Sequence, residues 1–360
     1  MKQTYLTLLI ILLTVGTLIF QVPEQLIVLG VLVVLSIILF AAKTVDKKHF
    51  FIICLAFVCL FYFTVVFYGP AVSIAKGAGV IYGNNWWESM LWIKNNTPEC
   101  TTVATYWDPG HFIAAIAQRA VVFDGASQND QIYYTYDGEN YTVYTRPNEN
   151  TTTHARIQDI STALFTGNET QAMELLKKYR KPGCNDMYFI ASNDLIFKSG
   201  WWSYFSTWTP EKHGTQYGYQ IMQRVSAQQV PSQNAVAYSF ADSNNPDQVI
   251  VVFDKQGELR ATFQQGNSFL TIKDIFYVDA TGQGLITSAP DAQVNGMVYV
   301  LGNNNAVIYM PPELEQSLFT KMFFFNGAGL KNFEFIKDYG QEVKLFKVHF
   351  DGNGQTVVVR

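Results

Sequence analysis

Charged side chains are scarce in this chain of 360 residues. Asp, Glu, Lys and Arg together make up 15% of it, against about 25% in typical soluble domains. Disordered segments and coiled coils both need more charge, so the composition disfavours them as the main architecture. The net charge is −4, and no long run of basic residues is present. A dedicated nucleic-acid-binding role is disfavoured as well, because such proteins carry a basic surface.

Compact catalytic motifs are also missing from the sequence. It contains no G-x-S-x-G nucleophile elbow, no P-loop, no H-E-x-x-H, no paired C-x-x-C and no G-x-G-x-x-G fingerprint. His111 follows Asp108 by three positions, a spacing found in metal sites. Without a third ligand, however, a role at the start of a helix is the favoured interpretation. The residues alone therefore indicate no self-contained catalytic centre.

Long apolar runs are concentrated at the start of the chain. Three of them follow one another with only short loops between: Tyr5–Phe20, Leu26–Ala42 and Phe51–Ala75. A helix needs about 17–25 residues to span a bilayer. A signal peptide would show a single run and a cleavage site. We therefore expect three transmembrane helices.

Lysine positions predict how these helices are oriented. Lys2 precedes the first run, and Lys43, Lys47 and Lys48 lie in the second loop, whereas the first loop has no Lys or Arg. Positively charged loops stay on the cytoplasmic side. We expect a multi-pass protein of the cell membrane, with a cytoplasmic N-terminus and an extracytoplasmic C-terminal domain.

The rest of the chain shows two patterns. Helical and strand patterns alternate from Asn84 to about Trp208, which is typical of an α/β layered domain. Beyond about Gln220, short strands prevail, and three hairpins are predicted. They pair 249–253 with 258–264, 297–301 with 306–310, and 344–350 with 355–360. The predicted fold class is a membrane-anchored α+β protein. It has transmembrane helices over residues 1–75, an extracytoplasmic mixed α/β core over 76–218 and a mostly β peripheral subdomain over 219–360.

Two cysteines outside the apolar runs lie at comparable places. Cys100 and Cys184 each come just before a predicted strand, Thr101–Trp107 and Met187–Ser192. If these strands are parallel neighbours, both cysteines lie at one edge of the sheet and can pair. Two separate thiols are the alternative.

Residues 85–130 contain a tryptophan-rich helix ending near N-T-P, then a strand, then a short aromatic and acidic motif. This motif is Tyr106-Trp107-Asp108-Pro109-Gly110, and it is followed by Arg119 and Asp124-Gly125. The order resembles the catalytic subunit of oligosaccharyltransferase, especially the archaeal AglB type, whose motif is W-W-D-Y-G. Tyr106 stands in place of the first Trp and Pro109 in place of the Tyr. Further segments resemble that family at 167–179, 194–208 and 317–335.

The resemblance implies a site that binds the acceptor sequon Asn-X-Ser/Thr. A hydroxyl donates once and accepts twice, so two donors and one carboxylate satisfy it. Such a pocket rejects residues that lack the hydroxyl, because its own polar groups are then left unpaired. The implied roles give Asp108 as acceptor and Trp107 and Tyr106 as donors. The family's second motif adds Asp194 and Lys198, which lie one helical turn apart.

Structural explanations for the same five residues remain open. The Asp-Pro-Gly sequence is a turn that explains Asp108 by itself, and core packing explains the aromatic residues. Asp194 fits a helix cap, and Lys198 fits a solvated charge.

The family's transferase half, a long multi-span region that holds a divalent metal, has no counterpart in this sequence. We therefore expect no catalytic residue and no cofactor within this chain, and Mn or Mg for a complete active site. The expected partners are an acceptor polypeptide with Asn-X-Ser/Thr, membrane lipid and a lipid-linked oligosaccharide. A separate subunit would carry the catalytic transmembrane half if the enzyme is split, and nucleic acid is not expected.

Three interpretations stay open. The chain is the acceptor-recognition part of an oligosaccharyltransferase, inactive alone and either truncated or one half of a split enzyme. Alternatively, it is a non-catalytic, membrane-anchored peptide-binding or accessory protein derived from that family, or a surface domain with a degenerate pocket. Sequons at Asn140, Asn150 and Asn168 predict glycosylation of the chain itself.

Overall fold

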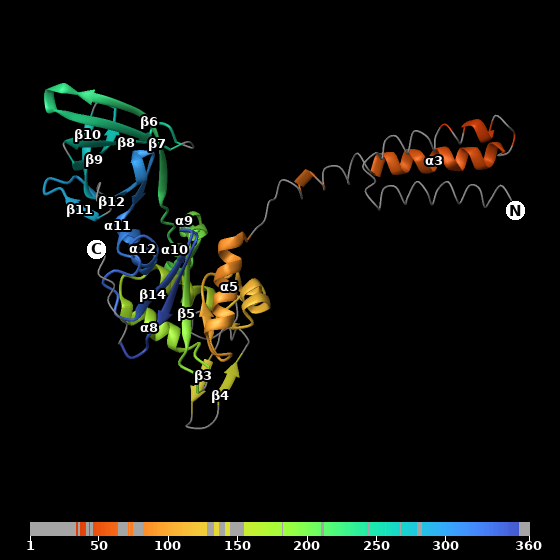
Figure 1. Cartoon of the computed structure of the whole chain (residues 1–360), viewed down its shortest axis with the longest axis horizontal. Coiled ribbons are helices and arrows are strands. Elements are labelled where there is room, and N and C mark those ends of the chain that lie inside the picture. Colours follow the sequence, from red (N-terminus) through yellow and green to blue (C-terminus); the bar gives the residue numbers. More distant parts are fainter. Residues whose placement is uncertain are drawn as a thin grey trace. The chain divides into compact units, whose positions relative to one another are not determined.

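The computed structural model describes two compact units, Met1–Ile81 and Tyr82–Arg360 (Figure 1). In the first unit it describes helix α3 (Lys47–Phe63) and a few residues around it. In the second it describes residues 82–352 apart from gaps at 128–132, 137–140, 145–154, 182, 210–211, 243–244, 256, 267 and 279–282.

The predicted transmembrane runs fall largely outside this part of the chain. Tyr5–Phe20, most of Leu26–Ala42 and most of Phe51–Ala75 beyond α3 are not among the described residues. Within the residues that are described, none of the helices combines the length and the apolar character that a bilayer-crossing segment needs.

A five-stranded sheet forms the centre of the second unit, in the order β14-β15-β5-β1-β2. Its strands are β1 (Thr102–Ala104), β2 (Ala120–Val121), β5 (Met187–Ser192), β14 (Phe333–Tyr339) and β15 (Val343–Val348). Strand β1 is parallel to both β2 and β5, so the predicted strands at Thr101–Trp107 and Met187–Ser192 are parallel neighbours. Strand β15 is antiparallel to β5 and β14. Two strands from the range 219–360 thus complete the sheet of the core.

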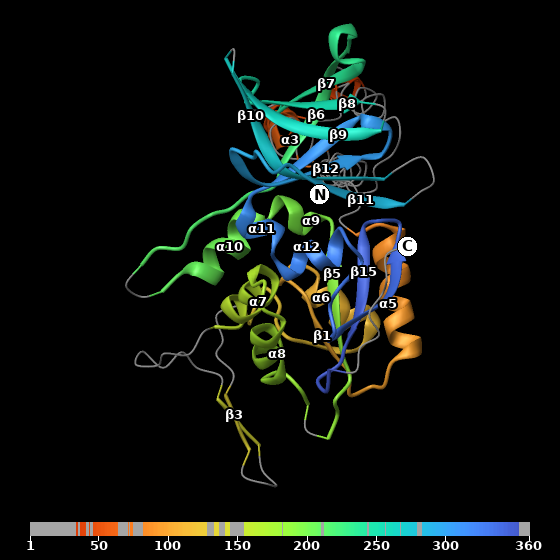
Figure 2. The same ribbon diagram turned by 90° about the vertical axis from the view of Figure 1, so that its left-hand side faces the viewer.

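Helices cover both faces of this sheet (Figure 2). One face carries α5 (Asn84–Asn96), α6 (Gly110–Phe112) and the π-helix η2 (Ile113–Ala117). The other carries α7 (Arg156–Phe165), α8 (Glu169–Lys177), α10 (Ser199–Thr207) and α12 (Leu318–Phe323).

Strand β5 illustrates why the core needs both layers. Phe189 and Ala191 pack with the helices α7, α8 and α12, whereas Tyr188 and Ile190 pack with α5. Because alternate side chains point to opposite faces of a strand, all six residues of β5 are buried. The mixed α/β core predicted from the sequence is therefore present.

A second, eight-stranded sheet follows, in the order β11-β10-β12-β13-β6-β7-β8-β9. Its strands are β6 (Gln220–Val230), β7 (Ala235–Ala241), β8 (Val249–Lys255), β9 (Glu258–Gln265), β10 (Ser268–Val278), β11 (Gly284–Ser288), β12 (Val294–Leu301) and β13 (Ala306–Met310). The first residues of β10 pair with β9, and the later ones pair with β11 and β12. The sheet therefore closes on itself around an apolar core.

The predicted hairpins of this region are confirmed in two cases, β8 with β9 and β12 with β13. A third was predicted between Lys344–Phe350 and Gln355–Arg360. Strand β15 pairs with β14 and β5, and Gln355–Arg360 lies outside the described residues. The remaining short elements are β3 (Tyr133–Tyr136), β4 (Tyr141–Tyr144), α9 (Asp194–Phe197), η3 (Pro231–Gln233), η4 (Gly302–Asn304) and α11 (Pro312–Glu315).

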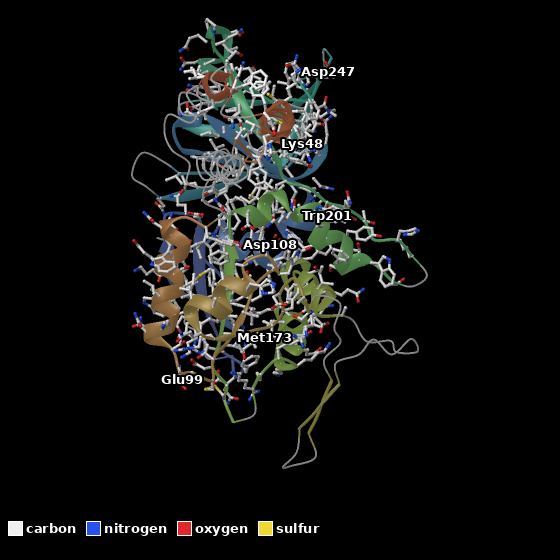
Figure 3. All side chains as sticks on the ribbon, turned by 90° about the vertical axis from the view of Figure 1, so that its right-hand side faces the viewer. Lys48, Glu99, Asp108, Met173, Trp201 and Asp247 are labelled. Carbon is white, nitrogen blue, oxygen red and sulfur yellow. A yellow bond between two sulfur atoms is a disulfide. The ribbon has the colours of Figure 1, made fainter. Side chains whose placement is uncertain are left out.

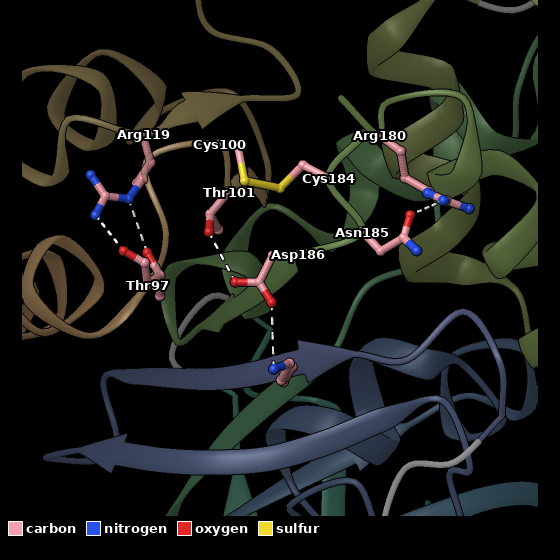
Figure 4. Close-up of a disulfide and its surroundings, with 9 residues drawn as sticks. Thr97, Cys100, Thr101, Arg119, Arg180, Cys184, Asn185 and Asp186 are labelled. Atoms are coloured by element: carbon pink, nitrogen blue, oxygen red, sulfur yellow. Dashed lines mark hydrogen bonds and ion pairs between the residues drawn. A yellow bond between two sulfur atoms is a disulfide. The ribbon is translucent and has the colours of Figure 1, made fainter. Parts of the chain in front are cut away.

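A disulfide joins Cys100 to Cys184 (Figure 4). The two cysteines precede the parallel strands β1 and β5. Of the two alternatives, the disulfide is confirmed and two separate thiols are not. Next to it, the Thr101 hydroxyl donates to the Asp186 carboxylate over 3.0 Å. These links hold the amino ends of the two strands together.

Arg119 is buried, and its side chain caps the C-terminal end of helix α5 although it belongs to a later segment. Its guanidinium donates to the backbone carbonyl oxygens of Lys94 and Thr97 over 2.7 and 2.6 Å, and to those of Ala117 and Gln118. The last carbonyls of a helix have no partner within the helix, so this side chain satisfies them. Arg119, which contributed to the family resemblance, has a structural role here.

Candidate functional site

Three loops meet at the carboxyl edge of the parallel strands. The loop after β1 carries Asp108, and the loop after β2 carries Asp124. After β5, Asp194 begins helix α9 and Lys198 directly follows that helix. In open α/β sheets this edge is where ligands bind. Figure 3 shows Asp108 at this edge, on the side of the molecule that also carries Trp201 of α10.

Lys198 joins the two predicted motifs. Its ammonium nitrogen lies 2.9 Å from Oδ2 of Asp108 and 2.7 Å from Oδ2 of Asp194. Three of the five predicted site residues, drawn from segments about ninety positions apart, are therefore in direct contact. The other carboxylate oxygen of Asp194 is buried and has no hydrogen-bond partner among the described residues.

The electrostatics of this cluster favour a protonated lysine. Burial acts to lower the pKa of Lys198, but the hydrogen bonds and charges of Asp194 and Asp108 outweigh it and hold that pKa above its ordinary value. Two carboxylates and one ammonium leave a net negative charge. Water has access to all three, since between 22% and 36% of each side chain is exposed.

The two aromatic residues of the motif lie differently. Tyr106 is buried in the core, where its ring packs edge to face on Phe123. Burial, and then the charge of Asp108, raise the pKa of the Tyr106 phenol. Trp107 is only partly buried and packs against the edge of the same core. Of the two donors expected from the family motif, only Trp107 thus reaches the surface.

Tyr82 belongs to the same cluster and was not expected from the sequence. Burial, followed by the charges of Asp108 and Asp194, raises the pKa of the Tyr82 phenol to about 12. Its ring contacts Phe112, with 4.3 Å between the ring centres. A lone Tyr ahead of a helix carries no motif that would have indicated this position.

His111 pairs with Asp124 rather than with Asp108. Its Nδ1 lies 3.2 Å from Oδ2 of Asp124, and the other carboxylate oxygen accepts from the Ser127 hydroxyl over 2.8 Å. Burial acts to raise the pKa of Asp124, but hydrogen bonds from Ser127 and Ala126 lower it overall. This network fixes the loop after β2 against the motif.

Gly110 permits the close approach of these two loops. A Cβ atom at this position would lie 2.7 Å from the Phe123 carbonyl oxygen and 2.7 Å from Cβ of Asp124. Any side chain would therefore push the turn that carries Asp108 away from the loop after β2. Steric crowding thus explains why the motif ends in a glycine.

The cluster does not fit a divalent cation. The described part of the chain contains no group of three His, Cys, Asp or Glu residues that could hold a metal ion. The ammonium of Lys198 already occupies the position between Asp108 and Asp194, where a cation would have to bind. These residues instead form a polar site suited to hydrogen-bond donors and acceptors.

Exposed aromatic side chains border the cluster. Phe197 is 76% exposed and Trp201 is 58% exposed, on either side of Lys198 in the α9–α10 segment. Phe112, which contacts Tyr82, is exposed as well. Large aromatic residues at a surface are typical of binding faces for other molecules.

Among the three predicted sequons, only Asn168 lies in the described part of the chain. Its side-chain oxygen accepts from the backbone nitrogens of Thr170 and Gln171 and thereby caps α8. Glycosylation at this position remains a prediction.

No protein-family model matches the chain. Two of the solved structures that match the chain are the C-terminal domain of C. jejuni PglB and an Archaeoglobus fulgidus oligosaccharyltransferase tethered with an acceptor peptide that contains the NVT sequon. The first has a TM-score of 0.47 and 15% identity, and covers 74% of this chain and 99% of that one. The second has a TM-score of 0.37 and 14% identity, and covers 83% of this chain and 28% of that one.

Two curated proteins match in sequence, and both are dolichyl-phosphooligosaccharide-protein glycotransferases. The protein of Methanocaldococcus jannaschii is 21% identical over 75% of this chain, and that of Methanococcus voltae is 23% identical over 71%. In each case the match spans 35% of the relative's length. The resemblance indicated by the motifs is thereby confirmed: most of this chain is similar to about a third of an archaeal AglB-type oligosaccharyltransferase.

Proposed function

We propose that the chain recognises the acceptor sequon Asn-X-Ser/Thr in protein N-glycosylation, and that Asp108, Lys198 and Trp107 contact the hydroxyl of the sequon. The observation that carries this proposal is the ion-pair cluster, in which Lys198 contacts both Asp108 and Asp194. The likeness to the archaeal glycotransferases supports the same function.

The chemistry of the cluster matches a Ser or Thr hydroxyl. A protonated lysine has three donors. One of them donates to Asp194, and the ammonium also lies 2.9 Å from Asp108 as an ion pair. A further N–H of the ammonium donates to the hydroxyl oxygen, while the Asp108 carboxylate accepts a hydrogen bond from the hydroxyl. The indole N–H of Trp107 hydrogen-bonds to the Tyr106 phenol in this structure, so it would supply the second donor by turning from that phenol to the bound hydroxyl. The buried phenol of Tyr106 has no direct part in this arrangement.

The sugar-transfer step needs groups that the cluster does not supply. We propose that a divalent metal, Mn or Mg, and the lipid-linked oligosaccharide are bound by a catalytic transmembrane half that acts together with this chain at the cell membrane. The transmembrane runs and their orientation, with the second unit outside the cytoplasm, belong to this proposal. Deprotonation and transfer at the acceptor Asn are not assigned to any residue of this chain.

Peptide binding tests the proposal. The full chain is titrated with a fluorescent peptide that contains Asn-X-Thr and with the same peptide carrying Ala in place of Thr. We expect binding of the Thr peptide to be tighter by about 5- to 150-fold, since a polar group left unpaired in the bound complex costs about 1–3 kcal/mol. Asp108→Asn is expected to abolish this preference. Equal affinity for both peptides would contradict the proposal.

Asp247→Asn is the matched control, because Asp247 is an exposed carboxylate on the second sheet's β7–β8 connection (Figure 3). It removes the same charge and is expected to leave the preference intact. Transfer assays with candidate partner subunits then separate an enzyme part from a non-catalytic accessory protein. Peptide binding without transfer in any combination would favour the accessory protein.

A further inference from the structure

A hollow lies on the closed sheet and is lined by residues that take no part in the site at Asp108. It has a volume of 380 Å³, which falls within the range of about 300–1,000 Å³ that is typical of small-molecule sites. Its wall contains an aromatic ring, three charged side chains and two hydroxyls, which are Phe253, Lys255, Glu258, Arg260, Thr262 and Thr271.

Strand register brings these side chains to one face. Phe253 lies opposite Arg260 and Lys255 lies opposite Glu258 in the β8–β9 pair. Thr262 lies opposite Thr271 in the β9–β10 pair. Since alternate residues of a strand share a face, the intervening residues Val252 and Ala261 point the other way, into the apolar core.

Among the described residues, the charged groups of this hollow have no ion-pair partner. Lys255 and Glu258 are direct cross-strand neighbours of opposite charge, yet they form no ion pair within 4 Å in the described part of the chain, and neither does Arg260. All three are exposed. Charges held side by side without partners remain available to a ligand.

We propose that this hollow binds a saccharide that carries a carboxylate, such as a hexuronic acid. The guanidinium of Arg260 matches a carboxylate through two parallel hydrogen bonds, and Lys255 adds a second cation. The face of Phe253, whose ring meets that of Phe269 edge to face, offers an apolar surface to the C–H groups of a sugar ring.

Glu258 and the two threonines distinguish a saccharide from a simple anion. A carboxylate accepts hydrogen bonds from hydroxyls but repels a phosphate dianion. The Thr262 hydroxyl donates to the Val251 carbonyl over 3.3 Å and keeps its acceptor sites for a ligand. The ligand must therefore offer hydroxyl donors on one side and a negative charge on the other.

The test uses the full chain in lauryl dimethylamine oxide, a detergent without a sugar headgroup. Methyl β-D-glucuronide and methyl β-D-glucoside are the probes, and binding is followed by ligand-observed NMR titration. We expect the glucuronide to bind about tenfold tighter than the glucoside, because hydrogen bonds to charged groups contribute about 1.5–3 kcal/mol. Arg260→Gln is expected to abolish this preference, and Phe253→Ala to weaken both sugars.

Arg224→Gln is the control, since Arg224 is an exposed arginine on β6 of the same sheet, outside the hollow. It is expected to leave both affinities unchanged. Sequon-peptide binding is measured on the same samples and should be equal in Arg260→Gln and the unmodified chain, so the two proposals fail independently. The inference is overturned if neither sugar binds, if Arg224→Gln has the same effect as Arg260→Gln, or if inorganic phosphate displaces the glucuronide at equal concentration.

Discussion

Replacing Lys198 by Met removes the cation that holds two carboxylates together. Met keeps an unbranched apolar stem of similar length, so the packing of that stem changes little. Asp108 and Asp194 are then left facing each other without a counter-charge. We expect the chain to lose stability through this repulsion.

The magnitude follows from the geometry of the cluster. The two carboxylate oxygens share one nitrogen at 2.9 and 2.7 Å, so they lie at most about 5.6 Å apart. At that separation two unit charges repel by about 0.7 kcal/mol in water and by about 3 kcal/mol at an effective dielectric constant of about 20. Because the side chains are partly exposed, we expect a loss of about 1–2 kcal/mol in the free energy of unfolding.

Urea unfolding followed by tryptophan fluorescence measures this loss. Asp194→Asn in the Lys198→Met background removes the repulsion and should recover most of the stability. High salt should also reduce the effect, since it screens partly exposed charges. Lys177→Met, at an exposed position late in α8, is the control and should change stability by less than about 0.5 kcal/mol. No recovery in the double variant would refute the electrostatic reasoning.

Reducing the Cys100–Cys184 disulfide, which closes a separation of 84 residues, should destabilise the chain by about 2–5 kcal/mol, measured by urea unfolding with and without reductant. Gly110→Ala should weaken sequon-peptide binding more than tenfold, because its Cβ would lie 2.7 Å from neighbouring atoms; unchanged affinity would contradict the steric argument. Arg119→Met should cost about 2–4 kcal/mol by leaving buried carbonyl oxygens unpaired, and equal stability would show that water replaces the guanidinium. The pKa of Lys198 is raised, so the stability gap between the chain and Lys198→Met should be constant from about pH 7 to 10 and shrink as pH rises through that raised value; a gap that shrinks below pH 9 would contradict this.

Several features of the fold followed from local sequence. The strands at Thr101–Trp107 and Met187–Ser192 were predicted from their composition, and their parallel pairing was the condition for the disulfide that the structure contains. The hairpin β8–β9 followed from two apolar runs around a short polar turn. The strands and the hairpin are local features, so neighbouring residues suffice to predict them. The parallel pairing of the two strands is not local, and the sequence offered it only as one alternative.

Long-range pairing was not predictable in the same way. Strand β15 joins β5 across more than 150 residues of chain, and nothing in its composition distinguishes this partner from the second sheet. The capping role of Arg119 likewise depends on carbonyl oxygens from other segments. Contacts of this kind form between segments that are far apart in the chain, so the residues next to each segment do not reveal them.

The candidate site was predictable in part. Family resemblance singled out Asp108, Asp194 and Lys198, and the structure places them in contact. The resemblance could not indicate that Tyr106 is buried in the core. Tyr106 lies past the end of the three-residue strand β1, where side chains no longer alternate between the two faces of the sheet. Tyr82 carried no signal, since its proximity to the carboxylates depends on the approach of a segment from before α5.

The position of β15 beside β5 bears on how the protein is made. A ribosome adds about 5–20 residues per second, so about 8–30 seconds separate the synthesis of Lys198 from that of Val348. Throughout that interval one edge of β5, an otherwise buried strand, has no neighbour to pair with. Until the final segment emerges, that edge can pair with another strand, so the interval before β15 is made is when the nascent chain is most exposed to aggregation.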